Sequence, residues 1–429
     1  MTTNQLMAAG VEIDITPPVG NGFDGYAARV GKSLGIHDPL LAQLLLLKSG
    51  NQQLALISMD LLGVGLDFTT RVRVGIEQSI GVPGDCIMIA CSHTHSGAAG
   101  FLPPHPGITT TIDAEQQQVV VRQLVGAAIW ANQKLEPACL GLGQGEVEGI
   151  GLNRNDPTQP MDREVTVLRV DSLSSQPMAV MMNYGCHPTV LGYQNLQYSA
   201  DYPGATRALL HKIYPDTIFM YTNGASGDVS TRFTRRDQSF NEVERMGYIL
   251  GGEVLKVMLS IVTKPSPFIT SRKASIELKF RPFPSAADAS HELAQLKAKL
   301  DALKASGAAH GEIRKAITKV EGASGQALMA KELEGRSGNK SQVQVLQIGD
   351  LALVGLPGEP FTRTVMEIKQ NYPQPTAVVS YANDYQGYFP DPNSVAMGNY
   401  EALISPYGPD VAGQLRDTAI ELLGVKSHV

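Results

Sequence analysis

Apolar segments of strand length alternate with helical segments along most of the chain, and this order limits the fold more than any other feature. Strands are predicted at Leu40–Lys48, Gln53–Met59, Cys86–Ser92, Ala138–Glu146, Glu164–Asp171, Met178–Tyr184, Thr217–Tyr221, Ser341–Ile348, Leu351–Leu356 and Ala377–Tyr381. Helices are predicted at 67–80, 113–134, Tyr202–Tyr214 and Asn241–Leu259. Because several strand pairs are joined by short turns, an all-parallel sheet is not expected. The sequence predicts an α/β fold of mixed β-sheets layered with helices.

One segment differs from the rest in composition. Residues 285–340 are rich in Ala, Lys, Glu and Leu, poor in aromatic residues, and interrupted at Ala305-Ser-Gly and Gly322-Ala-Ser-Gly. This pattern indicates a helical hairpin or short helical insertion whose charged face is solvated. We expect it to lie within one domain that covers residues 1–429, and the sequence shows no internal repeat.

Charge and cysteine content exclude several classes of function. The net charge of −6 indicates neither a nucleic-acid-binding footprint nor an anionic membrane surface as partner. The N-terminus lacks the pattern of a signal peptide, and no segment approaches 18 uninterrupted apolar residues, so a cytoplasmic protein without membrane insertion is expected. The four cysteines are scattered, which favours free thiols over disulfides or a zinc cluster.

Two histidines follow the apolar segment Cys86–Ser92. If the strand continued through the motif, His93 and His95 would project from the same face, because side chains at i and i+2 do so. Two imidazoles on one face can bind a metal, or one can bind while the other carries a proton. Histidines that merely bond backbone carbonyls are the alternative.

Four further strands also end in polar residues. His187 follows Met178–Tyr184, and Asp228 and Ser230 follow Thr217–Tyr221 in a small-residue loop. Glu359 comes just after Leu351–Leu356, and a tyrosine-rich segment follows Ala377–Tyr381. Each could be an ordinary turn or packing residue by itself. Together they favour a composite site at the strand ends, suited to a catalytic metal with nitrogen and oxygen ligands.

The order of these motifs resembles the N-terminal amidase domain of the neutral/alkaline non-lysosomal ceramidase family. The resemblance is carried by Ser92-His-Thr-His-Ser-Gly97, Leu152-Asn-Arg-Asn155, Asn183-Tyr-Gly-Cys-His-Pro188, Gly227-Asp-Val-Ser230, Pro357-Gly-Glu359, Asn383-Asp-Tyr-Gln-Gly-Tyr388, and Tyr400-Glu401 with Tyr407-Gly-Pro409. It implies a Zn²⁺ site whose ligands are His93, His187, Glu359 and Tyr388. By the same resemblance, His95, Arg154, Ser230 and Tyr400 contact the substrate or take part in catalysis, and Asp228 is expected to orient a histidine or Ser230.

Some positions depart from the family pattern. Thr231-Arg232 stands where Pro-Asn is usual, and Ala98-Ala99-Gly100 replaces Pro-Gly-Gly. The sequence shows no apolar helix suited to drawing a sphingolipid from a membrane. We therefore expect a small-molecule amide substrate that is more soluble than ceramide, with an acyl chain allowed. A homo-oligomer is also compatible with the sequence.

The resemblance implies a zinc-dependent amide hydrolase that uses metal-activated water. His95, with a pKa expected near neutrality, is the predicted donor of a proton to the leaving amine. Tyr400 or loop amides would stabilise the oxyanion, and Arg154 suits a polar acceptor on the substrate. An ester or lactone hydrolase with the same site, and an inactive ligand-binding homologue, remain as alternatives.

Overall fold

The structure is a computed structural model that describes residues 5–103, 111–266 and 268–424. One arrangement of four strands and two helices occurs three times along the chain. In each unit three strands pair antiparallel in succession, and a fourth pairs parallel to the third. One helix joins the third strand to the fourth, and another helix follows the fourth. The sequence shows no internal repeat, so what recurs is the order and pairing of the strands and not the residues.

The three units have these elements. Unit 1 contains β1 (Leu6–Asp14), β3 (Leu41–Ser49), β4 (Gln52–Met59), α1 (Leu66–Ile80), β5 (Ile87–Cys91) and α2 (Ala114–Gln133). Unit 2 contains β6 (Glu136–Glu146), β8 (Glu164–Ser172), β9 (Pro177–Tyr184), α3 (Asp201–His211), β11 (Ile218–Asn223) and α4 (Phe240–Ser260). Unit 3 contains β13 (Ile269–Lys279), β14 (Gly338–Ile348), β15 (Leu351–Gly355), α7 (Thr362–Gln370), β17 (Thr376–Val379) and α10 (Val411–Leu423). The mixed α/β fold class is confirmed.

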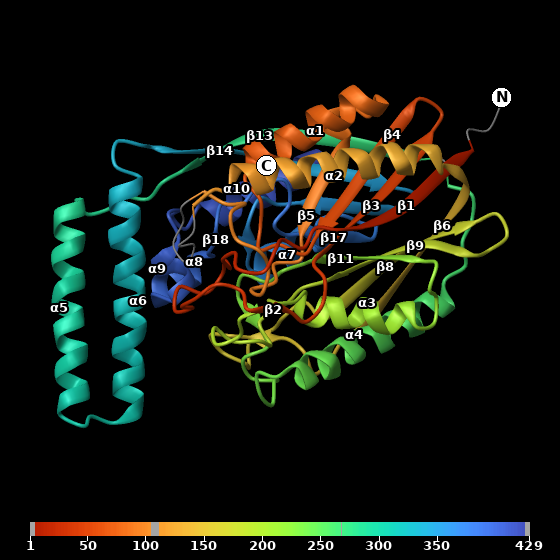
Figure 1. The fold of residues 1–429 in the computed structure, drawn as a ribbon. Coiled ribbons are helices and arrows are strands. Elements are labelled where there is room, and N and C mark those ends of the chain that lie inside the picture. The colour runs from red at the N-terminus through yellow and green to blue at the C-terminus, as the bar shows by residue number, and fades with distance from the viewer. Residues whose placement is uncertain (1–4, 104–110, 267, 425–429) are drawn as a thin grey trace.

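Most strands of the two large sheets are buried on both faces, whereas β6 and β13 are partly exposed. On β9, Met181 faces a core shared by all three units, whereas Val180 and Met182 face α3 and α4. The same alternation places α1 and α2 outside unit 1, and α7 and α10 outside unit 3. Figure 1 shows α1 and α2 on one side of the strands and α3 and α4 on the other. Burial on both faces explains why these strands appear as nearly continuous apolar runs.

Units 1 and 2 form one eight-stranded sheet, although β1 and β6 pair at only two positions, Met7↔Pro137 and Ala8↔Glu136. Unit 3 forms a separate four-stranded sheet. The three units meet at the ends of their fourth strands. The N–H of Ser380, after β17, donates to the carbonyl of Asn223 in β11. The bond from Asn383 N–H to the carbonyl of Ile89 joins the same region to β5. Loops that follow all three parallel strand pairs are thereby brought together.

The remaining elements are short or lie in the insertion. Between β13 and β14, α5 (Ala286–Ala305) and α6 (His310–Glu332) form a hairpin that stands away from the body (Figure 1), as the composition of residues 285–340 predicts. The small elements are β2 (Gly35–Ile36), η1 (Gly84–Cys86), β7 (Leu152–Asn153), β10 (Gln197–Tyr198), β12 (Val229–Ser230), β16 (Glu359–Pro360), β18 (Tyr388–Phe389), α8 (Pro392–Met397) and α9 (Tyr400–Ile404). The sequence-based prediction did not include the four helices that the structure describes between residues 362 and 423, although α7 and α10 each have one buried face.

Two expectations about the chain as a whole can be compared with the structure. The four cysteines are free thiols, two of them buried, as predicted. In the part of the chain that the structure describes, none of the helices has both the length and the apolarity needed to cross a bilayer.

Candidate metal centre and its surroundings

His93 and His95 lie beyond the end of β5 rather than on it. His93 has φ 67°, a left-handed conformation that ends the extended chain. The two rings meet edge to face with centroids 4.9 Å apart, and their Nε2 atoms are 3.3 Å apart. The predicted pair therefore exists, but the predicted reason was wrong: a left-handed turn brings the rings together, not strand alternation.

Backbone carbonyls determine which nitrogen of His93 and His187 faces the site. His93 Nδ1 lies 2.7 Å from the carbonyl of Leu62, which follows β4. His187 Nδ1 lies 2.5 Å from the carbonyl of Ser226, which follows β11. A carbonyl oxygen can only accept, so both Nδ1 atoms carry the proton and both Nε2 atoms present a lone pair. Such fixed tautomers are characteristic of histidines that bind metal.

Unit 3 supplies the two oxygen groups. Glu359 and Tyr388 are register partners in the small parallel pair of β16 and β18. The Glu359 carboxylate lies 3.0 Å from His187 Nε2 and 3.8 Å from His93 Nε2. The ring of Tyr388 lies 6.4 Å from that of His187, centroid to centroid. All four predicted ligands are therefore neighbours, although they come from loops up to about 300 residues apart in the chain.

The donor set fits a divalent cation. His187 Nε2 is buried and makes no hydrogen bond of acceptable geometry, although the Glu359 carboxylate lies beside it. Two lone-pair groups that face each other in a buried site repel each other, and either a proton or a metal cation between them removes this repulsion. Ligand atoms of His93, His95 and His187 all lie within 4.8 Å of one another. One carboxylate with imidazoles matches the ligands that zinc prefers.

Protonation states agree with this arrangement. Burial lowers the pKa of His93 to about 3, so its ring is neutral and able to bind a metal. Burial alone would raise the pKa of Glu359, but positive charge at the facing His93 and His187, with Arg154, outweighs it and holds that pKa at about 2. Where the imidazoles are neutral, a bound divalent cation would supply that positive charge. Neutral imidazoles and an ionised carboxylate are the forms that coordinate metal.

His95 differs from its predicted state. Burial, and then the neighbouring His93 and His187, lower its pKa well below the ordinary value. The expectation of a pKa near neutrality was wrong, because the ring is buried. That burial could not be read from the sequence. Tyr26 packs on the ring at 4.7 Å between centroids, and Arg29 Nη1 donates to the His95 carbonyl at 2.5 Å.

Two tyrosines that were not predicted as site residues also contact the cluster. Tyr385 donates its hydroxyl to Glu359 at 2.6 Å. Tyr381 has φ 55° and stacks on His93 with centroids 3.8 Å apart. Its hydroxyl also lies 2.7 Å from Ser226 Oγ. The tyrosine-rich segment in the sequence pointed to this region. Which tyrosine contacts which ligand depends on how the chain turns after β17.

Arg154 and Tyr400 lie at the outer side of Tyr388. The guanidinium of Arg154 lies 5.1 Å from the centre of the Tyr388 ring and forms a buried ion pair with Glu401, at 2.5 Å. Arg154 Nη2 also donates to the carbonyl of Gly227 at 2.7 Å. Glu401 and the Gly227 carbonyl thus already neutralise or solvate much of the positive charge of Arg154. Tyr400 packs beside Tyr388, and burial raises its pKa to about 12.

Asp228 has a different role from the predicted one. Its Oδ1 accepts hydrogen bonds from the backbone N–H and the hydroxyl of Thr362, at 2.8 and 2.9 Å. Its Oδ2 accepts from Asn153 Nδ2 at 2.9 Å. The carboxylate therefore holds the start of α7, and no hydrogen bond in the described part of the chain joins it to a histidine or to the Ser230 side chain.

Asp228 leads to a prediction about pH. Burial raises its pKa from 3.8 to about 6, so the folded state retains a proton that the unfolded chain has already released. Stability from this group is therefore greatest below pH ~4 and is lost as the pH rises to ~6. The stability of wild type relative to Asp228→Asn should fall by about 2 to 3 kcal/mol across that window in denaturant titrations. A pH-independent difference would contradict the raised pKa.

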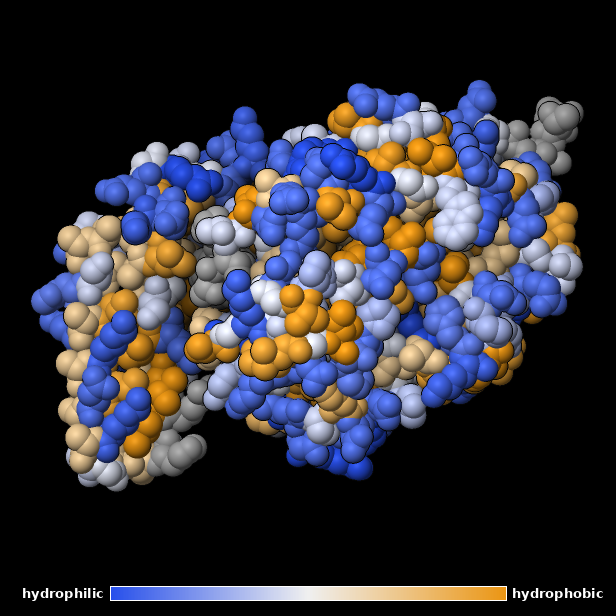
Figure 2. Space-filling model, in the orientation of Figure 1, coloured by the Kyte–Doolittle hydropathy of each residue, from blue (hydrophilic) through white to orange (hydrophobic). Residues whose placement is uncertain are grey.

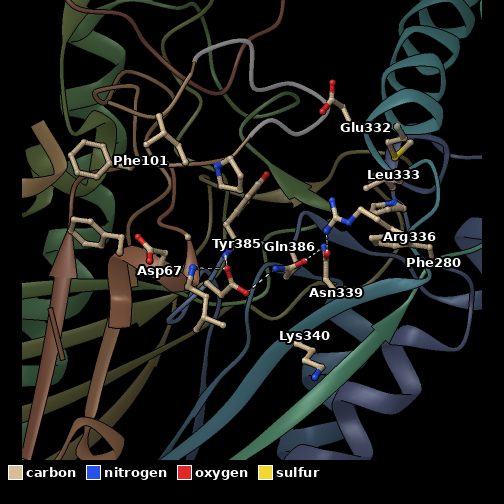
Figure 3. A pocket seen from close by; sticks show the side chains of 18 of the residues that line it. Asp67, Phe101, Phe280, Glu332, Leu333, Arg336, Asn339, Lys340, Tyr385 and Gln386 are labelled. Atoms are coloured by element: carbon tan, nitrogen blue, oxygen red, sulfur yellow. Dashed lines mark hydrogen bonds between the residues drawn. The ribbon is translucent and has the colours of Figure 1, made fainter. Parts of the chain in front are cut away.

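A separate cavity of about 300 Å³ lies between α6 and the body. Figure 3 shows Phe101 and Asp67 on one side of it and Leu333 and Arg336 on the other. Tyr385 lines this cavity while its hydroxyl bonds Glu359. None of the three clustered histidines lines it, so the cavity and the metal-ligand cluster are different places that share one wall residue.

Sequence comparison places this geometry in a known group. A profile described as neutral/alkaline non-lysosomal ceramidase, N-terminal, matches residues 7–231, which is more than half of the chain. The chain belongs to this family. The matched segment includes His93, His95 and His187, whereas Glu359 and Tyr388 lie beyond it.

Individual ceramidases match over shorter lengths. Neutral ceramidase A of Dictyostelium discoideum is 26% identical over 219 residues, which cover 46% of this chain and 31% of that protein. Neutral ceramidase B of the same organism is 26% identical over 141 residues, covering 29% of this chain and 20% of that protein. The alignments thus span a third or less of each relative.

Solved ceramidase structures share the whole fold. The crystal structure of neutral ceramidase from Pseudomonas aeruginosa superposes on 98% of this chain and 74% of that chain, with a TM-score of 0.78 and 16% identity. A structure described as ceramidase complexed with C2 gives a TM-score of 0.76 at 15% identity, over 98% of this chain and 75% of that chain. At these identities the likeness concerns the fold alone, and it extends through unit 3.

Proposed function

We propose that this ceramidase-family chain is a zinc-dependent hydrolase that cleaves a carboxamide (N-acyl) bond with water as nucleophile. The observation that supports it most is the pair of imidazoles held by backbone carbonyls so that their Nε2 lone pairs face the Glu359 carboxylate. His93, His187, Glu359 and Tyr388 would hold the ion. Zinc at such a site brings the pKa of water towards ~7 and polarises a carbonyl.

The chain's own residues divide the remaining work. His95 Nε2 lies 3.3 Å from His93 Nε2, so the proton that the attacking water releases can pass to it, although its low pKa makes it a weak base. Its conjugate acid is strong, because the pKa is low, and it can then protonate the leaving amine nitrogen. Tyr400 keeps its phenolic proton, since its pKa is raised to about 12, and can donate to the oxyanion. Arg154 positions Tyr388 and is available to a polar acceptor on the substrate.

Metal analysis with matched substrates tests this proposal. Purified protein should contain about one zinc per chain and hydrolyse an N-acyl amide, and chelation should remove both. An ester or lactone hydrolase would instead hydrolyse the matched ester, in which the same acyl group is joined to an alcohol, faster than the amide. An inactive binding homologue would hydrolyse neither substrate, even with zinc bound. The small-molecule amide, with or without an acyl chain, stays a proposal until such a screen.

Ser230 provides a test of the nucleophile. Its Oγ accepts from the Arg232 N–H at 3.3 Å, and no hydrogen bond in the described part of the chain joins it to a histidine. A serine nucleophile needs an adjacent base. Ser230→Ala should therefore lower kcat by less than ~10²-fold, whereas loss of a true nucleophile costs ~10⁴-fold or more. Steady-state kinetics decide, with trapping of an acyl-enzyme as the outcome that would favour covalent catalysis.

A further inference from the structure

The hairpin of α5 and α6 packs on α9, the short helix that carries Tyr400 and Glu401. Figures 1 and 2 show that the turn between α5 and α6 projects away from the body, so the hairpin is attached at its other end. The Gly322-Ala-Ser-Gly segment, expected to interrupt the helical pattern, lies inside the continuous helix α6. These glycines therefore need an explanation other than a break in the helix.

Gly322 allows α6 to approach α9 closely. It is buried, and a Cβ atom added to it would lie 3.1 Å from Leu403 Cδ1 and 3.4 Å from Leu403 Cβ. A larger side chain at this position must push Leu403, and with it α9, away from α6. Because glycine weakens the interior of a helix, the close contact with α9 accounts for its presence here.

Arg281, which lies between β13 and α5, holds the C-terminal end of α9. Its Nη2 donates to the carbonyl of Leu403 and its Nε donates to that of Ser405, both at 3.0 Å. Its backbone N–H donates to the carbonyl of Pro406 at 2.9 Å. The last carbonyls of a helix lack partners within the helix, and a basic side chain can supply the missing donors. The start of the insertion and the middle of α6 thus both hold α9.

The residues of α9 are in turn bonded to the surroundings of Tyr388. Glu401 forms the buried ion pair with Arg154, whose guanidinium lies over the Tyr388 ring. Ser405, directly after α9, donates its hydroxyl to the Tyr388 carbonyl at 2.8 Å. Tyr400 packs in the same small apolar cluster as Tyr388. A displacement of α9 therefore moves a proposed metal ligand together with two residues proposed to act on the substrate.

We propose that the α5–α6 insertion positions the Tyr388 side of the candidate metal centre, with Arg281 and Gly322 as its positioning residues. Its effect on hydrolysis rests on the proposed function, whereas its effect on the order of α9 does not. His93 and His187 are held by carbonyls of units 1 and 2, so a displaced α9 leaves them in place. Disturbing the insertion should therefore lower the rate of turnover and leave the fold intact.

Kinetics of two variants and a rescue test the effect on turnover. Gly322→Leu and Arg281→Ala should each lower kcat by about 10²-fold, because a small displacement of positioned groups is enough for such a loss. Adding Leu403→Ala to Gly322→Leu should restore most of the lost kcat, since it makes room for the added side chain. A loss caused only by general destabilisation would not be restored by removing a second side chain from the same contact.

Matched variants on the same two elements are the controls. No atom of the described chain lies within 4 Å of a Cβ added to Gly311, which is also on α6, so Gly311→Leu should keep full kcat. Arg272, on β13, donates to the carbonyl of Leu422 in α10 at 3.0 Å. Arg272→Ala thus removes a similar bond to a different helix, and it should also keep full kcat.

Amide hydrogen exchange measured by mass spectrometry tests the positioning without any hydrolysis assay. Peptides that cover β18 and α9 should exchange at least about tenfold faster in Gly322→Leu and Arg281→Ala than in wild type, whereas peptides of β5 and β9 should not change. If wild type hydrolysed no amide, the proposed function would fail while this result still supported the positioning. The inference is overturned if β18 and α9 exchange as slowly in these variants as in the controls, or if Leu403→Ala restores neither slow exchange nor kcat.

Discussion

Replacing His187 with alanine should remove the metal and at least ~10³ of the hydrolytic rate, because a metal contributes several kcal/mol to stabilising the transition state. His187 Nε2 is buried against Glu359, and its Nδ1 is held by the carbonyl of Ser226. Zinc per chain by mass spectrometry of metals, together with amide hydrolysis, measures both effects.

Two other histidine variants make this experiment specific. His291→Ala, on the exposed face of α5, should retain full zinc and activity. His95→Ala should retain zinc but lose activity if His95 only transfers protons. Loss of zinc from His95→Ala would instead make His95 a ligand, which its place among the three clustered histidines allows. A His187→Ala protein that kept both zinc and hydrolysis would refute the proposed centre.

Replacing Arg207 with alanine should destabilise the fold by about 3–5 kcal/mol, since it leaves a buried carboxylate unpaired. Arg207 of α3 donates to both carboxylate oxygens of Asp60, with Nη1 at 3.1 Å from Oδ1, and both side chains are buried. Asp60 directly follows β4, so the pair connects units 1 and 2. Urea denaturation measures the loss directly.

The same variant should weaken metal binding. The carbonyls of Leu61 and Leu62, just after Asp60, accept from the N–H and Nδ1 of His93. Any shift of this segment moves a predicted ligand. The exposed pair of Arg71 and Asp67 is the control: Asp67→Ala should cost below ~1 kcal/mol. If Arg207→Ala and Asp67→Ala lowered the free energy of unfolding and metal affinity equally, the buried Arg207–Asp60 pair would not support the metal centre.

Much of the secondary structure could be predicted because periodicity is a local property. Apolar runs such as Met178–Tyr184 predicted β9, and the polar residues after them, including His187 and Glu359, predicted site positions. The assignment of those residues to specific ligand roles came from family resemblance and still awaits metal analysis. The helices between residues 362 and 423 were not predicted, although α7 and α10 each have a buried face at helical spacing.

The sequence by itself determined where strands end and which reactive side chains follow them, since both depend on neighbouring residues in the chain. Only the tertiary structure decided what these side chains do. Burial lowers the pKa of His95, and the donors of Asn153 and Thr362 occupy Asp228. Burial, hydrogen-bond partners and local charge all depend on contacts between distant segments, and the order of residues does not specify those contacts directly.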